Sequence, residues 1–186
     1  TMSVAAPEPF RWSRDRYERM VEAGILGPET RVQLLDGEVI QMTPQGSRHA
    51  GVVRLVETAL RPLVPDGHDL RSQMPLALDD RSEPEPDVAI VPGAPRQHIL
   101  AHPSRALLVV EVSESSLGLD RTLKQRIYAR NAVPEYWVVN LVEAALEVHR
   151  DPRGDGYRER RVLKAGATIE PLPCPSTALA VADLLP

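Results

Sequence analysis

The sequence predicts an α/β (α+β) fold in which helices flank a mixed central sheet. Short apolar runs typical of buried strands lie at 87–91, 106–112 and 133–140. Stretches with helical apolar spacing precede and separate these runs, over about 48–62 and 121–131. A helix signal and a hairpin signal come before all of them, so we also expect an N-terminal helix and β-hairpin.

A length of 186 residues favours one domain with a sizeable core. We expect the proline-rich residues 1–11 to form an arm and residues 12–186 to form the domain, with its core at about 31–150. No run approaches the roughly 18 consecutive apolar residues of a membrane helix, and no signal-peptide pattern stands at the start. The single cysteine, Cys174, excludes an internal disulfide and indicates a cytoplasmic protein.

The formal net charge of −4 argues against a protein that coats nucleic acid without specificity, since such proteins are usually strongly basic. A nuclease remains compatible with this charge, because catalytic carboxylates can coexist with a local arginine patch. One cysteine and scattered histidines cannot build a zinc site. The sequence also lacks a phosphate-binding glycine loop, a dinucleotide fingerprint and a nucleophile elbow.

The N-terminal part predicts a helix and then a hairpin. Ser13 is a suitable N-cap for a helix over about 14–23, and Gly24 is its stop signal. Asp36 and Gly37 separate two short apolar runs, which is a strong hairpin signal.

Ser47 and Asp120 are the expected N-caps of the two later helices. Further strands are expected over 70–78, over 145–150 as an edge beside 133–140, and more weakly near 157–163.

Two carboxylates lie on the predicted buried strands. Asp87 begins one strand directly after Pro86, where a turn residue is the ordinary interpretation. Glu111 has only apolar neighbours on its strand, so a cation, a metal ion or several hydrogen bonds must compensate its burial. A structural ion pair with an arginine is the alternative. Period-two geometry places Ser113 on the same face as Glu111.

Lys124 is one of only two lysines among 22 basic residues, the other being Lys164. In a chain that otherwise uses arginine, a lysine suggests a role that needs a compact ammonium group, such as contact with a scissile phosphate or attacking water. The alternative is an exposed i,i+4 pair with Asp120, which stabilises a helix by only about 0.3–0.5 kcal/mol. Asp87, Glu111 and Lys124 together form the trio that metal-assisted phosphodiester hydrolysis uses.

Other polar residues are weaker candidates for supporting roles. Glu57 lies at the edge of the apolar stripe of its helix, and His49 lies near the start of that helix, where capping is the commoner role. Glu38 follows the hairpin turn, and Gln73 interrupts an apolar strand.

Several motifs resemble those of one nuclease family. They are Leu-Asp-Gly-Glu over 35–38, Ser-Arg-His over 47–49, Ser-Glu-Pro-Glu-Pro-Asp-Val over 82–88, Leu-Val-Val-Glu-Val-Ser-Glu-Ser-Ser-Leu over 108–117, Asp120-Arg121 with Lys124, Tyr-Ala-Arg over 128–130, and Val-Pro-Glu-Tyr-Trp-Val-Val-Asn over 133–140. In order and spacing, over roughly residues 12–150, the chain resembles the Uma family of restriction-endonuclease-like proteins, a branch of the PD-(D/E)XK nuclease superfamily.

The resemblance implies a restriction-endonuclease-like fold and a divalent-metal-dependent endonuclease acting on DNA as a homodimer. Asp87 and Glu111, with the backbone carbonyl of Val112, would bind Mg²⁺ or Mn²⁺. Lys124 would be the superfamily lysine moved to the next helix, because Ser113 occupies its usual position. The resemblance also puts Glu38, His49 and Gln73 near the site. A nuclease-fold binding or regulatory protein without turnover, or a hydrolase of RNA or a nucleotide, remains an alternative.

Overall fold

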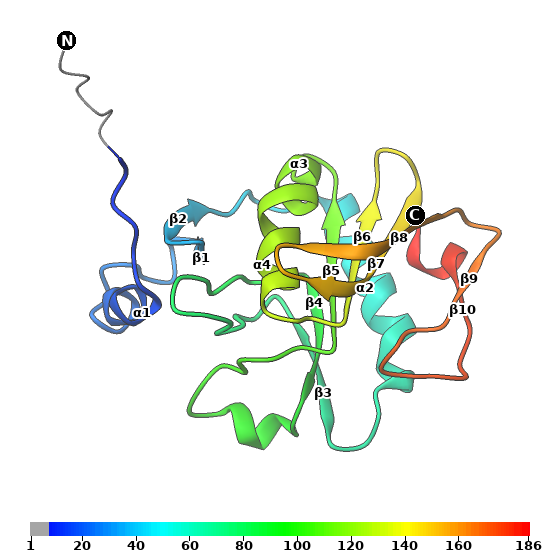
Figure 1. Cartoon of the computed structure of the whole chain (residues 1–186), viewed down its shortest axis with the longest axis horizontal. Helices are drawn as coiled ribbons and strands as arrows, with labels where there is room; N and C mark the ends of the chain where they lie inside the picture. The colour runs from blue at the N-terminus through cyan, green and yellow to red at the C-terminus, as the bar shows by residue number, and fades with distance from the viewer. Residues whose placement is uncertain (1–7) are drawn as a thin grey trace, which may run out of the picture.

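The computed structural model describes residues 8–186, in which an N-terminal helix and hairpin precede the sheet and its covering helices (Figure 1). Of the predicted arm, residues 1–7 lie outside the described part, and residues 8–11 are exposed and belong to no helix or strand. No helix within residues 8–186 has the length and apolar character needed to cross a membrane.

The N-terminal helix and the hairpin form as predicted. Helix α1 (Arg14–Glu22) begins after Ser13, whose hydroxyl accepts a hydrogen bond from the Arg16 backbone N–H at 3.3 Å. Strands β1 (Val32–Leu35) and β2 (Glu38–Gln41) pair antiparallel. Asp36 and Gly37 between them both have positive φ, 49° and 82°, which is the backbone of the tight hairpin turn that Asp-Gly favours.

The central sheet has six strands in the order β3-β4-β5-β6-β7-β8, and the predicted mixed sheet is therefore confirmed. The strands are β3 (His68–Ser72), β4 (Val88–Pro92), β5 (Leu108–Ser113), β6 (Glu135–Asn140), β7 (Ala145–Arg153) and β8 (Gly156–Leu163). Only β5 and β6 run parallel; every other neighbouring pair is antiparallel.

Helices cover both faces of this sheet (Figure 1). Helix α2 (Ser47–Leu60) packs on one face and continues into the 3-10 turn η1 (Arg61–Leu63). The crossover from β5 to β6 carries α3 (Leu117–Leu119), the π-helical turn η3 (Asp120–Lys124) and α4 (Gln125–Arg130) on the other face. The remaining elements are η2 (Pro95–His98), β9 (Thr168–Ile169), β10 (Leu179–Ala180) and η4 (Val181–Leu184).

Successive side chains along each strand point to opposite faces of the sheet, and this divides the core into two layers. On β5, Val110 and Val112 pack with α2 and the C-terminal segment, whereas Val109 packs with Tyr128 of α4. Glu111 and Ser113 therefore face the α4 layer, as the period of two predicts. Both are buried, so the interior of this layer must supply partners for their polar atoms.

Two predictions about strands and two about helix N-caps were wrong. The strand expected over 70–78 ends at Ser72, because Gln73 has a positive φ of 52° that no regular strand accommodates. The strand near 145–150 is not an edge, since β8 pairs along it. Ser47 does not cap α2, whose N-cap is Gly46, and Asp120 lies inside a helical segment that begins at Leu117.

Candidate active site

The register of β4 and β5 brings the two predicted carboxylates together. Val88 and Val110 are the partners nearest the end of this antiparallel ladder. The next pair in the same register is Asp87 and Glu111, and directly opposite side chains lie on one face within about 5 Å. This end of the ladder opens into a cleft that is also lined by His49, Glu85 and Lys124.

Asp87 is held by two neighbours. Its Oδ2 accepts a hydrogen bond of 2.8 Å from the backbone N–H of Val112, and its Oδ1 lies 3.0 Å from Nε2 of His49. The hydrogen bond to Asp87 raises the pKa of His49, burial opposes this, and the charges of Asp87, Glu111 and Asp120 add to the increase. His49, at the start of α2, therefore fixes the carboxylate of Asp87 from the opposite side of the sheet end.

Glu111 is 3 % exposed and has two donors on the same oxygen. The ammonium of Lys124 lies 2.9 Å from Oε1, and the hydroxyl of Tyr128 donates to Oε1 at 2.6 Å. No hydrogen bond from residues 8–186 reaches Oε2, although Glu111 lines the cleft. Oε1 of Glu111 is thus held from the α4 side, whereas Oε2 is available to a ligand in the cleft.

Lys124 is buried and does not form the exposed helix pair that was its alternative interpretation. It is 6 % exposed and contacts both Glu111 and Asp120, the latter at 3.5 Å. Asp120 is itself 1 % exposed and accepts hydrogen bonds of 2.6 Å from the hydroxyls of Ser113 and Ser116. The π-helical turn that spans Asp120 to Lys124 turns both side chains toward the sheet, and such turns are frequent at functional sites.

Buried acidic groups outnumber basic groups in and beside the cleft. Asp87, Glu111 and Asp120 face one ammonium group and one histidine. Burial raises the pKa of Glu111, Lys124 opposes this increase and the neighbouring acids Asp120 and Asp87 strengthen it, so that the pKa is about 8 overall. Burial lowers the pKa of Lys124, but the three carboxylates outweigh it and raise that pKa overall, so Lys124 keeps its proton.

The donor atoms of the cleft suit a hard divalent cation. In an extended strand the N–H and C=O of one residue point to the same side, so the Val112 carbonyl points toward Asp87 as its N–H does. Asp87, Glu111 Oε2 and this carbonyl are the oxygen ligands that Mg²⁺ and Mn²⁺ prefer. No group of three or more His, Cys, Asp or Glu side chains in residues 8–186 is arranged to hold a metal ion, so backbone and water oxygens would have to complete the coordination.

Three of the weaker candidates lie outside the cleft. Glu38 forms an ion pair with Arg11 at 2.5 Å. Glu57 is buried but is already bound by Arg54 and by the hydroxyl of Ser72. Gln73 follows β3, and its backbone N–H donates to the carbonyls of Pro86 and Asp87.

Glu85, Asp120 and Tyr128 line or support the cleft but were not predicted as site residues from the sequence. Glu85 lies two residues before Asp87, so a period of two indicated a shared face. Asp120 and Tyr128 both lie four residues from Lys124, on either side of it, and gave no signal that separated a buried cluster from an exposed helix face.

The raised pKa of Glu111 predicts how stability depends on pH. Its folded-state pKa of about 8 lies above the ordinary 4.5, so the folded state binds this proton more tightly than the unfolded state. We expect the melting temperature to fall as the pH rises from about 5 to about 8 and Glu111→Gln to flatten this slope. Calorimetry across this range measures it, and an equal slope in Glu111→Gln contradicts the assignment. The exposed Glu159→Gln serves as the control.

Comparison with known proteins agrees with the predicted family and fold. A family model described as "Uma2: Putative restriction endonuclease" matches residues 14–182. Among solved structures, the chain is similar to one titled a putative nuclease belonging to DUF820 from Anabaena variabilis ATCC 29413, with 16% identity and a TM-score of 0.65. That match covers 92% of this chain and 96% of the other, and it shows a shared fold. No significantly similar sequence was found among curated proteins.

Proposed function

The chain belongs to the Uma2 family, and on that premise and the geometry of the cleft we propose that it is a divalent-metal-dependent endonuclease that hydrolyses phosphodiester bonds of DNA. The observation that carries the proposal is the convergence of Asp87, Glu111 and Lys124 on one cleft at the end of β4 and β5. The ion pair between Lys124 and Glu111 supports it further, because an exposed helix pair would leave Lys124 without access to the cleft.

The predicted site residues and the side chains that hold them each have a role in this proposal. Asp87, Glu111 and the Val112 carbonyl would hold Mg²⁺ or Mn²⁺, which when bound polarises a phosphoryl oxygen and acidifies water. Lys124 keeps its proton, so it stabilises the negative charge that develops on the phosphoryl group and does not act as a base. Tyr128 and His49 hold Glu111 and Asp87 in position.

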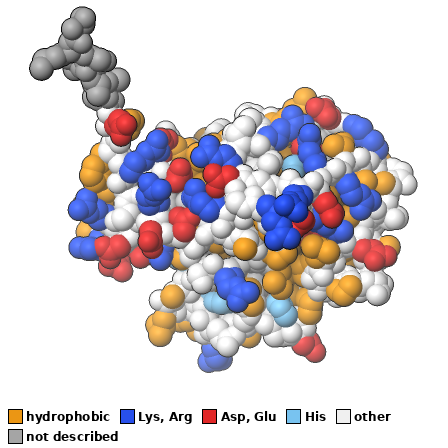
Figure 2. Space-filling view, in the orientation of Figure 1, with side chains coloured by type: hydrophobic (Ala, Val, Ile, Leu, Met, Phe, Trp, Pro, Cys, Tyr) orange, Lys and Arg blue, Asp and Glu red, His pale blue; other side chains and the backbone are white. Residues whose placement is uncertain are grey.

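DNA is the proposed substrate even though the chain is acidic overall. Figure 2 shows basic side chains gathered over the β7–β8 hairpin. The exposed basic residues of β8 and its ends are Arg153, Arg158, Arg160, Arg161 and Lys164. Such a local cluster provides phosphate contacts that a net charge of −4 does not reveal.

We further propose that residues 12–186 act as one domain and that the protein works as a homodimer in the cytoplasm. Two-fold symmetry suits cleavage of both strands of a duplex. Light scattering of the purified protein with and without a DNA duplex measures the number of subunits.

We expect the protein to cleave supercoiled plasmid or single-stranded DNA when Mg²⁺ or Mn²⁺ is added and to be inactive in excess chelator. Glu111→Ala is expected to lower the rate on the order of 10²–10³-fold, since several kcal/mol of transition-state stabilisation depend on the cation it holds. Gel assays of both substrates, with an RNA and a cyclic dinucleotide alongside, measure the activity. No cleavage of any substrate, or equal cleavage by Glu111→Ala, contradicts the proposal. DNA binding that survives this change without any cleavage would instead indicate a binding protein.

A further inference from the structure

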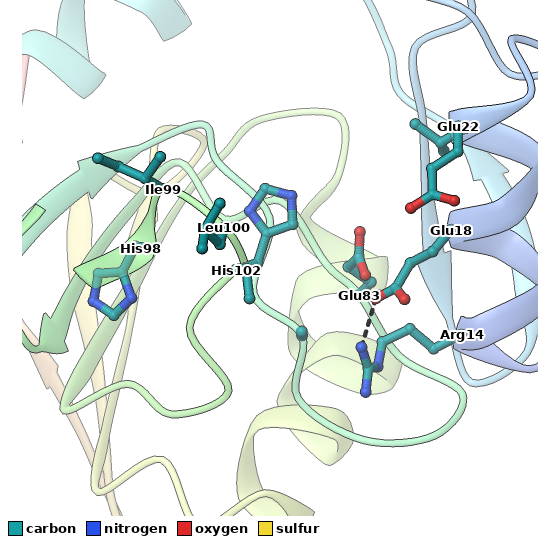
Figure 3. Close-up of a pocket in the computed structure, with 11 residues that line it drawn as sticks. Arg14, Glu18, Glu22, Glu83, His98, Ile99, Leu100 and His102 are labelled. Atoms are coloured by element: carbon teal, nitrogen blue, oxygen red, sulfur yellow. Dashed lines mark hydrogen bonds and ion pairs between the residues drawn. The ribbon is translucent and has the colours of Figure 1, made fainter. Parts of the chain in front are cut away.

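A second pocket lies between helix α1 and the loop that follows η2, and it shares no lining residue with the proposed active site. Figure 3 shows the side chains of Arg14, Glu18 and Glu22 on α1 facing the 98–102 loop, with Glu83 between them. None of these residues has a part in the proposed nuclease reaction. The pocket therefore needs a separate explanation.

Glu83 is the unusual member of this pocket. Its side chain is only 6 % exposed, and within residues 8–186 its Oε2 has no hydrogen-bond partner. A buried carboxylate without a partner is destabilising, so such groups in native proteins normally have a donor, a cation or a bound proton. Glu83 lines the pocket with this oxygen unsatisfied.

The nearby positive groups do not satisfy Glu83. Arg14 already donates hydrogen bonds to Glu18 Oε1 at 2.5 Å and to the carbonyl of Asp79 at 3.0 Å. Burial and the neighbouring Arg71 lower the pKa of His102, which therefore remains neutral near pH 7. Among the pocket-lining residues within 8–186, the carboxylates of Glu18, Glu22 and Glu83 outnumber the one arginine, Arg14, so acidic groups are in excess in the pocket.

The two closest carboxylates compete for a proton. Burial and the neighbouring Glu18 together raise the pKa of Glu83 to about 7, whereas Arg14 opposes the increase. Near neutral pH the pocket therefore alternates between holding a proton and having an unpaired carboxylate. A bound cation would replace that proton.

Apolar side chains from the loop and from α1 complete the pocket. Ile99 is 72 % exposed and Leu100 is 98 % exposed, and Val21 of α1 is 46 % exposed. All three line the pocket together with the carboxylates. A ligand that suits this arrangement has a positive end and an aliphatic body, whereas a bare metal ion would leave the apolar rim unused.

We propose that this pocket binds an organic cation with an aliphatic stem, namely an alkyl guanidinium or alkyl ammonium group. The cationic end pairs with Glu83 and Glu18, and the stem packs on Val21, Ile99 and Leu100. A free polyamine and the side chain of a basic residue on a partner protein both present this chemistry. The proposal does not depend on the nuclease activity.

Calorimetric titration of the full chain at low salt tests the proposal, with agmatine, spermidine and a blocked arginine peptide as probes and n-butylurea as the neutral analogue. Saturable binding of agmatine or spermidine, without binding of n-butylurea, supports a small-molecule ligand. Binding of the blocked peptide alone supports a partner's side chain. Absence of saturable binding by all three cationic probes, or equally tight binding of n-butylurea, overturns the proposal.

Glu83→Gln is expected to weaken binding about tenfold or more, because a charge-assisted hydrogen bond is lost. Titrations at pH 7 in two buffers of different ionisation enthalpy should show proton release on binding to the wild type and not to Glu83→Gln. Glu18→Gln gives a second test if Glu83→Gln does not fold, and Glu159→Gln on β8 is the matched control. Unchanged affinity in both pocket variants, or an equal loss in Glu159→Gln, contradicts the assignment.

Discussion

Asp87→Asn is expected to reduce metal-dependent DNA cleavage by on the order of 10³-fold, the largest loss among single changes in the cleft. Asparagine keeps the shape of the side chain and an oxygen that accepts the Val112 N–H bond. It removes the negative charge that a divalent cation requires and that His49 contacts at 3.0 Å. The fold should therefore survive while the proposed metal site is lost.

Two measurements separate loss of metal binding from general damage. Mn²⁺ should raise the melting temperature of the wild type, since a cation that binds only the folded state stabilises it, and this increase should disappear in Asp87→Asn. The hydrogen bond to Asp87 raises the pKa of His49, so an NMR titration should show a lower His49 pKa in the variant. Asp66→Asn, in the turn before β3, is the control. An unchanged Mn²⁺ effect in Asp87→Asn excludes this carboxylate as a ligand.

The location of both carboxylates on buried strands was predictable because it depends on strand periodicity and order. Asp87 and Glu111 lie on short apolar runs, and an antiparallel register sets them opposite each other. The same reasoning does not extend to the residues just upstream. A strict period of two would put Glu83, Glu85 and Asp87 on one face, but Pro84 and Pro86 interrupt the ladder. Glu83 consequently lines the pocket beside α1, whereas Glu85 lines the cleft.

The surroundings of Lys124 were only partly predictable. Scarcity of lysine pointed to the residue, and the structure places its ammonium against Glu111 as well as Asp120. A regular helix with 3.6 residues per turn was the expectation for this segment, and the π-helical turn is a departure that no apolar spacing reveals. The hydroxyls of Ser113 and Ser116 stabilise Asp120 there, and these contacts depend on the packing of the crossover against β5.

Lys124→Met is expected to lower the free energy of unfolding by about 3–5 kcal/mol at pH 9, because it leaves the carboxylate of Glu111 buried without a counter-charge. The loss should be smaller at pH 6, where Glu111, whose pKa is raised to about 8 by burial even beside Lys124, takes up a proton. Urea unfolding at both pH values measures the difference. The only other lysine provides the control: Lys164 is exposed and donates to the Glu143 carbonyl, so Lys164→Met should change stability by no more than about 0.5 kcal/mol.

The double variant Lys124→Met with Glu111→Gln separates the structural role of the pair from its proposed catalytic role. Glutamine carries no charge, so the penalty of an unpaired carboxylate is removed and most of the lost stability should return. Cleavage should remain absent, since both the cation ligand and the stabilising ammonium are missing. If the double variant instead recovers cleavage along with stability, Lys124 and Glu111 serve only to hold the fold. If Lys124→Met is as stable as the wild type at pH 9, the buried ion pair does not form in solution.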